Sequence, residues 1–537
     1  MEYTDQQLRQ DQGIASLLLA LLGMGALYFF YSRNEILLSG DAVAHINISR
    51  RIFDSRTPSL LQLGTVWLPL QHVLTVPFIV PQKLWQSGVG GSVISVLAFV
   101  IGGRGILRLA QLWGSRAAAW LALAIYAFNP NLLYVQSTAL NEPLGVATLI
   151  WATLYFSEFI REWEKPQQHD VRSMKQLLWK GTLTLDAAML TRYDGWFVAL
   201  LCWTLVFVWT AKSWFKEPGR FALLPHIKRT MALCLVLTAL APALWMAYNY
   251  MAFGNALDFA NGPYSAKAIA ERTTPPGAVR YPGYKNPVVA ALYFEKDARL
   301  NLGARPWADI LFIFAIAGSV WSLVEGEVAT VILLWSMLAF YPLSIAYGSV
   351  PIFMPDWYPF SYYNTRYGLE LLPAIAVGFA GCMVYLEKAI SSKKNGRWIW
   401  ALTLVLAASY ISACYQIPVC LRETRANGKA RLAHEALLAN TLKRFPEQST
   451  LLTYVGDHSG ALQRAGIPFR RTINEGNRGW WQMALRHPAQ AADFVIASQG
   501  DPVAQAVKEN PEGLEMLEVL HTQGQPPTTI YRSSLRH

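Results

Sequence analysis

Apolar runs separated by short polar segments fill most of the first 417 residues. A helix needs about 20 mostly apolar residues to cross the roughly 30 Å hydrocarbon core of a bilayer. The first run lacks a basic leader and an obvious cleavage site, so we interpret it as an uncleaved anchor rather than a signal peptide. Runs that approach the length of a span lie at 15–31, 91–112, 117–135, 143–160, 196–214, 231–251, 308–324, 328–347, 369–387 and 398–417.

Two further segments are ambiguous. WLPLQHVLTVPFIV (67–80) is short and contains Pro69 and Pro77, which favours a re-entrant or interfacial helix over a span. The segment 177–191 is interrupted by a lysine and an aspartate. If 177–191 crosses and 67–80 does not, most short basic loops fall on one side, which the positive-inside rule assigns to the cytoplasm. This choice predicts about eleven spans in total.

The composition changes after residue 417, where long apolar runs give way to charged residues, Gly and Pro. Strands ending in turns are predicted at STLLTYVGD (449–457) and ADFVIASQGD (492–501), and helices at 429–444 and 502–509. The predicted fold is mainly α: a polytopic transmembrane bundle at 1–417 with amphipathic helices in its outer loops. A small α/β soluble domain at 418–537 follows, on the outer face.

Composition excludes an ordinary soluble protein, because 53% of the residues are hydrophobic and only 15% are charged. The net charge of +11 comes from Lys and Arg lying between apolar runs, as in loops held near anionic lipid, so we expect no nucleic-acid partner. The 5 cysteines show no CxxC spacing and are interpreted as small core residues.

Several polar side chains collect at one membrane level in this topology, although they come from distant parts of the chain. This convergence is the main functional signal in the sequence, because charge near a bilayer is costly. The residues are Asp41, Asn141, Glu142, Arg192, Asp194 and Arg366.

Asp41 and His45 are four residues apart in GDAVAHINISRRIF, so they share a face if the segment is helical. We expect a helix along the membrane surface whose polar start points into a cavity. The alternative is that Asp41 only caps the helix. Trp67 and His72 lie on the Pro-bent segment nearby, where a sugar-binding or lipid-gating role competes with an interfacial aromatic and a satisfied histidine.

Glu142 precedes Pro143 at the start of a span, where a carboxylate also suits the positive end of the helix dipole. Arg192 and Asp194 lie in a turn between spans and could form a simple local ion pair. Arg366, next to Tyr367, lies at a helix entry. Its guanidinium suits bidentate binding of phosphate, and the alternative is a side chain that snorkels to the interface.

Four stretches together resemble the GT-C class of integral-membrane glycosyltransferases: SGDAVAHINISRRIFDS, TVWLPLQH, NEP and RYGLELLP. The resemblance covers about 30–390 and points to the bacterial aminoarabinose transferases and protein O-mannosyltransferases. It implies a polyprenyl-phosphate sugar as donor and transfer at the outer membrane face, usually with inversion. It also implies that Asp41 is the catalytic acidic residue, Glu142 a second acidic site and Arg366 the basic residue facing the lipid phosphate.

The sequence departs from this pattern in two places. Mannosyltransferases usually have two adjacent acidic residues in the first outer loop, whereas Asp41 is followed by Ala42. The Lys-Pro-Pro of the aminoarabinose enzymes is replaced by WLPL. The identity of the acceptor, whether glycan, lipid or protein, therefore stays open.

The chemistry that follows has Asp41 as the base that accepts a proton from the acceptor hydroxyl. Arg366, with Arg192 as second choice, would bind the donor phosphate and stabilise its departing charge. The residues expected to contact acceptor and sugar are His45, Trp67, His72, Glu142, Asp194 and Tyr367.

No tightly bound cofactor is expected. A divalent ion, Mg²⁺ or Mn²⁺, could be held by Asp41 and Glu142 with help from Asp194 and His45, although the spacing is not a dedicated metal signature. The long outer loop 252–307 is rich in Tyr, Pro and Gly and could fold over the cavity as a lid.

Two other classes compete with an enzyme. A transporter or flippase of lipid-linked sugars would show internal repeats and charges near the bilayer midplane. A receptor that binds sugar through its C-terminal domain would leave the membrane-level carboxylates without a role. We expect an integral protein of the bacterial inner membrane, with membrane lipids, a lipid-linked donor and an acceptor as partners, and with its site and C-terminal domain outside the cytoplasm.

Overall fold

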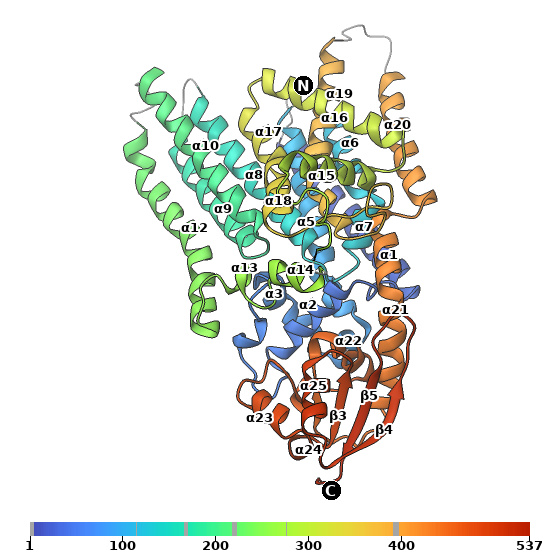
Figure 1. The fold of residues 1–537 in the computed structure, drawn as a ribbon. Coiled ribbons are helices and arrows are strands. Elements are labelled where there is room, and N and C mark those ends of the chain that lie inside the picture. Colours follow the sequence, from blue (N-terminus) through green and yellow to red (C-terminus); the bar gives the residue numbers. More distant parts are fainter. Residues whose placement is uncertain are drawn as a thin grey trace.

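The computed structural model describes residues 5–113, 115–165, 170–216, 223–274, 277–389 and 397–536. A helical bundle occupies one end of the molecule and a small α/β region the other (Figure 1). The helices of the first half are α1 (Asp5–Ser32), α2 (Gly40–Arg51), η1 (Leu60–Leu63), α3 (Leu70–Ile79), α4 (Gln82–Ser87), α5 (Val89–Gln111), α6 (Arg116–Ala127), α7 (Pro130–Val135), α8 (Glu142–Glu164), α9 (Val171–Met189), α10 (Asp194–Lys216) and α12 (Leu224–Phe253).

The rest of the bundle consists of shorter connecting helices and a second group of apolar ones. These are α13 (Asp258–Asn261), α14 (Ala266–Thr273), α15 (Pro287–Leu302), α16 (Trp307–Val324), α17 (Val328–Trp335), α18 (Met337–Tyr347), η2 (Thr365–Leu371), α19 (Leu372–Ala389) and α20 (Arg397–Tyr415). The helix α21 (Val419–Leu442) then leads from the bundle into the α/β region (Figure 1).

The eleven apolar segments predicted to cross the membrane are all helical in the structure. Among the described residues, 9 helical segments are long and apolar enough to span a bilayer. The other two predicted spans are α9, which carries charge, and the run 117–135, which is divided between α6 and α7. Asn129 causes that break because its side chain caps α7 by accepting from Leu132 N at 2.9 Å, with Pro130 next in the chain.

The segment 67–80 forms the short helix α3, only 10 residues long, which begins after Pro69 and contains Pro77. It is too short to cross the hydrocarbon core. In the described part of the loop 252–307 the chain forms three helices, and α15 packs against α18 and η2 instead of remaining an extended loop. Whether any part of this loop closes over a substrate stays a prediction.

The α/β region is built on a 5-stranded sheet in the order β2-β1-β3-β5-β4. Its elements are β1 (Leu451–Thr453), α22 (Val455–Ala465), η3 (Phe469–Arg471), β2 (Thr472–Ile473), α23 (Trp480–Arg486), α24 (Pro488–Ala491), β3 (Phe494–Ser498), α25 (Pro502–Glu509), β4 (Leu514–Leu520) and β5 (Thr528–Ser533). β1 pairs in parallel with β2 and β3, whereas β5 pairs antiparallel with β3 and β4. The two predicted strand segments contain β1 and β3.

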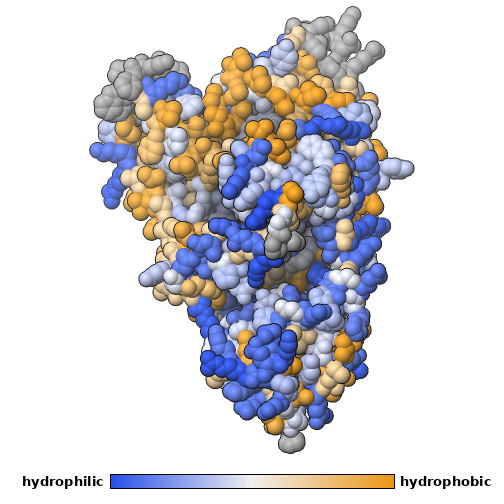
Figure 2. Space-filling view, in the orientation of Figure 1, coloured by the Kyte–Doolittle hydropathy of each residue, from blue (hydrophilic) through white to orange (hydrophobic). Residues whose placement is uncertain are grey.

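The surface of the molecule follows the same division. Hydrophobic residues cover much of the helical end, and hydrophilic residues dominate the α/β end (Figure 2). Exposed Leu, Ile and Val side chains on the long helices are expected where lipid tails replace water as the solvent. The protein is therefore an integral membrane protein, mainly α, with a small α/β region at one end.

Candidate functional site

Asp41 lies in the first turn of α2, at the junction between the bundle and the α/β region. Ser39 is the N-cap of this helix, and its hydroxyl accepts from Ala42 N at 3.4 Å. The alternative that Asp41 only caps α2 is therefore wrong, because another residue does so. The Asp41 carboxylate instead points toward η2, with 41% of the side chain exposed.

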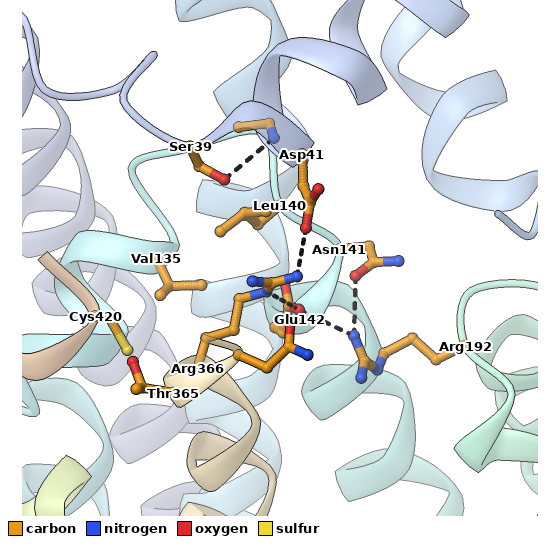
Figure 3. Close-up of polar contacts among 12 residues, drawn as sticks. Ser39, Asp41, Val135, Leu140, Asn141, Glu142, Arg192, Thr365, Arg366 and Cys420 are labelled. Atoms are coloured by element: carbon orange, nitrogen blue, oxygen red, sulfur yellow. Dashed lines mark hydrogen bonds and ion pairs between the residues drawn. The ribbon is translucent and has the colours of Figure 1, made fainter. Parts of the chain in front are cut away.

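Arg366 of η2 joins two of the predicted carboxylates (Figure 3). Its Nη2 donates to Asp41 Oδ2 at 2.5 Å, and its Nε donates to Glu142 Oε1 at 2.7 Å. The Glu142 side chain is 2% exposed, and that of Arg366 is 14% exposed. A guanidinium can donate in several directions at once, so a single arginine holds two acids from distant parts of the chain.

Arg192 approaches the same carboxylate from the other side. Its Nη1 donates to Glu142 Oε1 at 3.1 Å and to Asn141 Oδ1 at 3.0 Å (Figure 3). Its Nε donates to Asp194 Oδ2 at 2.9 Å, so the predicted local ion pair exists but is only one part of a larger network. One oxygen of Glu142 is thus shared by two arginines.

Two residues within the apolar helices complete this network. Tyr341 of α18 accepts a hydrogen bond from Arg192 Nη2 at 2.8 Å and donates to Asp194 Oδ2 at 3.2 Å. Glu370 of η2 lies 3.3 Å from Arg192 Nε. Burial alone would lower the pKa of Arg192, but Tyr341, Asp194, Glu370 and Glu142 together raise it well above its usual value. The guanidinium is therefore a fixed charge.

Tyr367 lies beneath both arginines. The guanidinium carbon of Arg366 is 5.2 Å from the centre of the tyrosine ring, and that of Arg192 is 5.3 Å away. The ring of Tyr341 is a further neighbour, with the two ring centres 5.3 Å apart. The cations are therefore held by aromatic faces as well as by carboxylates, which restricts their movement.

His45, His72 and Trp67 form a separate cluster. His45 Nδ1 lies 2.8 Å from His72 Nε2, and the His45 ring centre is 4.7 Å from that of Trp67. Both histidines are buried. Burial lowers the pKa of His45 to about 4, although Asp41 and Glu142 act in the opposite direction. Asp41 and His45 therefore contact different partners, despite the four-residue spacing between them.

The carboxylates that were expected to hold a divalent ion are instead paired with arginine. Within the residues that the structure describes, no group of three or more His, Cys, Asp or Glu side chains is arranged to hold a metal. Asp41 and Glu142 are bridged by the Arg366 guanidinium. Whether Asp41 and Glu142 also hold a divalent ion stays a prediction.

A cavity of about 230 Å³ opens beside Asp41 and Arg366. Its wall includes Tyr363 and Asn364, which precede η2, and residues of α21. The α21 residues that line it are Cys420, Glu423, Thr424, Asn427 and Arg431. This volume suits a group the size of one sugar and is smaller than the roughly 300 Å³ at which pockets for drug-sized ligands begin.

Sequence reasoning missed Tyr341 and all of the α21 residues. Tyr341 lies inside an apolar run, where nothing in the pattern distinguishes it from a core aromatic. Glu423 falls just after the predicted end of the membrane region, in a charged stretch typical of a solvent-exposed helix. Its only signal is its position within a few residues of the last span, and this signal is weak.

Comparison with known proteins identifies the fold. No family model and no curated protein matches the sequence. The aminoarabinose transferase ArnT of Cupriavidus metallidurans, crystallised with undecaprenyl phosphate, is similar in structure with a TM-score of 0.57 and 13% identity, over 96% of this chain and 97% of that chain. Its apo structure gives a TM-score of 0.56 at 13% identity, over 96% of this chain and 98% of that chain.

A second similar structure is the archaeal oligosaccharyltransferase AglB of Archaeoglobus fulgidus, in complex with an inhibitory peptide and a dolichol-phosphate. Its TM-score is 0.50 at 13% identity, over 91% of this chain and 69% of that chain. Both proteins are membrane glycosyltransferases of the GT-C class. The present chain therefore has the GT-C fold, and the resemblance noted from its short motifs is confirmed at the level of the fold.

Proposed function

We propose that this protein is a glycosyltransferase that moves a sugar from a polyprenyl-phosphate donor to an acceptor hydroxyl, with inversion. The observation that supports this most directly is the contact between Asp41 and Arg366 beside a cavity lined by polar and apolar side chains. Transfer from a lipid phosphate needs a base for the acceptor and a cation for the leaving group. Asp41 would be the base and Arg366 the cation, and a hydrogen bond joins the two side chains.

In the proposed reaction Asp41 accepts the proton of the acceptor hydroxyl. The acceptor oxygen forms a bond to the anomeric carbon while the bond from that carbon to the phosphate oxygen breaks. The electron pair leaves with the lipid phosphate, whose charge Arg366 stabilises and Arg192 supports. A phosphate that binds Arg366 would replace Asp41 as its partner, and this exchange would leave the carboxylate available as the base.

The two neighbours in the fold support the class of donor, because their structures contain undecaprenyl phosphate and dolichol-phosphate. A flippase remains the second candidate. The position of the charges favours the enzyme, because Asp41, Glu142 and Asp194 each lie in the first turn of a helix. Transporter sites are expected near the middle of the bilayer, at interrupted helices.

We further propose that the site and the region 418–537 face away from the cytoplasm in a bacterial inner membrane. The basis is the excess of Lys and Arg in the short loops on the other side, because the positive-inside rule applies to short loops. The acceptor would be a glycan, lipid or protein hydroxyl reached from that outer face, and membrane lipids would surround the bundle. Cysteine labelling of the α/β region in intact cells tests the orientation.

The test of function is release of lipid phosphate from a panel of undecaprenyl-phosphate sugars by purified protein. Asp41→Asn should slow release by about a hundredfold or more, because a general base is lost. Asp54→Asn is the matched control, since Asp54 is also an arginine-paired aspartate of the same outer segment, 2.8 Å from Arg50. Absence of release from every donor by the parent would refute the proposal, and equal turnover by Asp41→Asn would remove this residue from it.

A further inference from the structure

The Asp41 and Arg366 side chains meet although each is carried by a short segment with little regular structure before it. Arg366 is the second residue of η2, and the preceding Asn364 has a left-handed backbone with φ 58°. Asp41 follows an irregular turn at 33–39. Segments of this kind need contacts with other parts of the chain to keep Arg366 Nη2 and Asp41 Oδ2 2.5 Å apart.

On the Arg366 side, α21 contributes one buried carboxylate, in addition to the contacts that Asp297 and Asn301 of α15 make with η2. Glu423 of α21 accepts from Asn364 N at 2.9 Å, from Thr365 N at 2.7 Å and from Thr365 Oγ1 at 2.6 Å. The first amides of a helix have no partner within it, so these bonds fix where η2 begins. Glu423 also lies 3.8 Å from Arg366 Nη1.

On the Asp41 side, the contacts come from the same helix one and two turns later. Arg431 Nη2 donates to Leu37 O at 2.7 Å and to Leu38 O at 3.0 Å, directly before the Ser39 cap of α2. A Cβ added at Gly428 would lie 2.2 Å from Leu38 O, so glycine is required for this close approach. One face of α21 therefore holds the segments on both sides of the pair.

We propose that α21 aligns Asp41 with Arg366, and that Glu423 is the positioning residue on the Arg366 side. The inference rests on the proposed function for its catalytic meaning, but the alignment itself is a property of the structure. Because α21 also packs against α22 and β4 of the α/β region, that region is joined mechanically to the reactive pair. A partner or acceptor bound there would act on the site through this helix.

Glu423→Gln is the decisive variant. A glutamine has one accepting oxygen, so its NH₂ group must face at least one of the three donors that Glu423 now satisfies. Hydrogen–deuterium exchange of the full-length protein in detergent should become faster in peptides covering 361–371. It should also become faster in 36–45, because Arg366 no longer holds Asp41. Glu423→Asp keeps the charge and should restore part of the protection.

Asp501→Asn is the matched control. Asp501 is a buried carboxylate that accepts from Ser498 N at 2.9 Å and Ala504 N at 2.6 Å, but it lies in the α/β region. Its variant should leave exchange in 36–45 and 361–371 unchanged. If Glu423→Gln does not fold, Thr365→Val removes only the hydroxyl bond and should give the same pattern on a smaller scale.

Binding of undecaprenyl phosphate, followed as a shift in melting temperature, tests whether the position of Arg366 affects binding of the lipid. Affinity should fall about tenfold in Glu423→Gln, since Arg366 is misplaced, and recover partly in Glu423→Asp. Unchanged exchange in 36–45 would overturn the inference whether or not the parent is an enzyme. A parent that neither binds this lipid nor releases it from any donor would overturn the proposed function, and the exchange data would still decide the role of α21.

Discussion

Two clusters meet at α2, and they differ in how the protein handles charge. At the start of the helix, Asp41 contacts Arg366 in a network of carboxylates and guanidinium groups. One turn later, His45 contacts His72, and burial keeps both rings neutral by lowering the pKa of each. Asp41 and Glu142 lie against a guanidinium group, whereas each histidine ring lies against the other in surroundings that desolvate both.

The largest effect is expected from Arg366→Ala, which deprives both Asp41 and Glu142 of their shared cation. Turnover should fall about a hundredfold or more, because a preorganised partner of the leaving group is lost. The buried Glu142 would also lose one of its two cations, which should lower the free energy of unfolding by about 3 kcal/mol. Lipid-phosphate release per folded molecule and denaturant titration separate the two losses. Parental turnover in this variant would contradict the proposed role.

A smaller loss is expected from Arg192→Lys. A lysine keeps the charge but lacks the planar fork that reaches Glu142, Asn141 and Asp194 together. Loss of one charged hydrogen bond is worth about 1.5 kcal/mol, or about tenfold in rate. Arg161→Lys, at the other end of α8, changes an arginine paired with Glu327 and should leave the rate unchanged. Similar rates for the two variants would place Arg192 outside the reaction.

The stability contributed by the cluster of His45, His72 and Trp67 should decrease in acid. The folded pKa of His45 is about 4, below its ordinary value of 6.5, so protonation favours the unfolded chain. The stability it contributes is present above pH 6.5 and is lost as the pH falls toward 4. The melting temperature of the parent should therefore fall more steeply over this window than that of a variant with both His45→Gln and His72→Gln. Parallel curves would show that these histidines do not set the acid sensitivity.

The smallest effect is expected from Trp67→Phe. Phenylalanine preserves an aromatic ring against His45, so the loss of stability should be about 1 kcal/mol or less. If Trp67 only packs in the neutral cluster, the KM for the lipid-linked donor should equal that of the parent. A raised KM without a change in melting temperature would instead assign Trp67 to sugar binding, and would join the two clusters into one site.

The apolar pattern predicted the helices of the bundle and the short α3, because these follow from the length of each run and from Pro positions, but it did not predict the break between α6 and α7. Asp41, Glu142 and Arg366 could be placed at one level for the same reason. Their pairing could not be predicted, since it depends on the path of η2. His45 was grouped with Asp41 by spacing alone, but its partner His72 comes from another helix.

Glu423 shows a second limit of sequence reasoning. A change in composition near residue 417 suggested that the membrane part ends there, and charged side chains beyond it looked solvent-exposed. In the structure the first turns of α21 still pack against the bundle before the helix reaches the α/β region, and Glu423 is buried beside η2. Composition describes the average surroundings of a segment and carries no information about one face of a helix.

The oxygen that Glu142 shares between Arg366 and Arg192 has a further consequence. Two cations that compete for one acceptor cannot both be held at full strength. A ligand that draws one guanidinium away leaves the acceptor entirely to the other, which then becomes harder to move. A ligand bound to Arg366 would therefore change the affinity of Arg192 for a second ligand, and the second ligand would change the affinity of the first by the same factor.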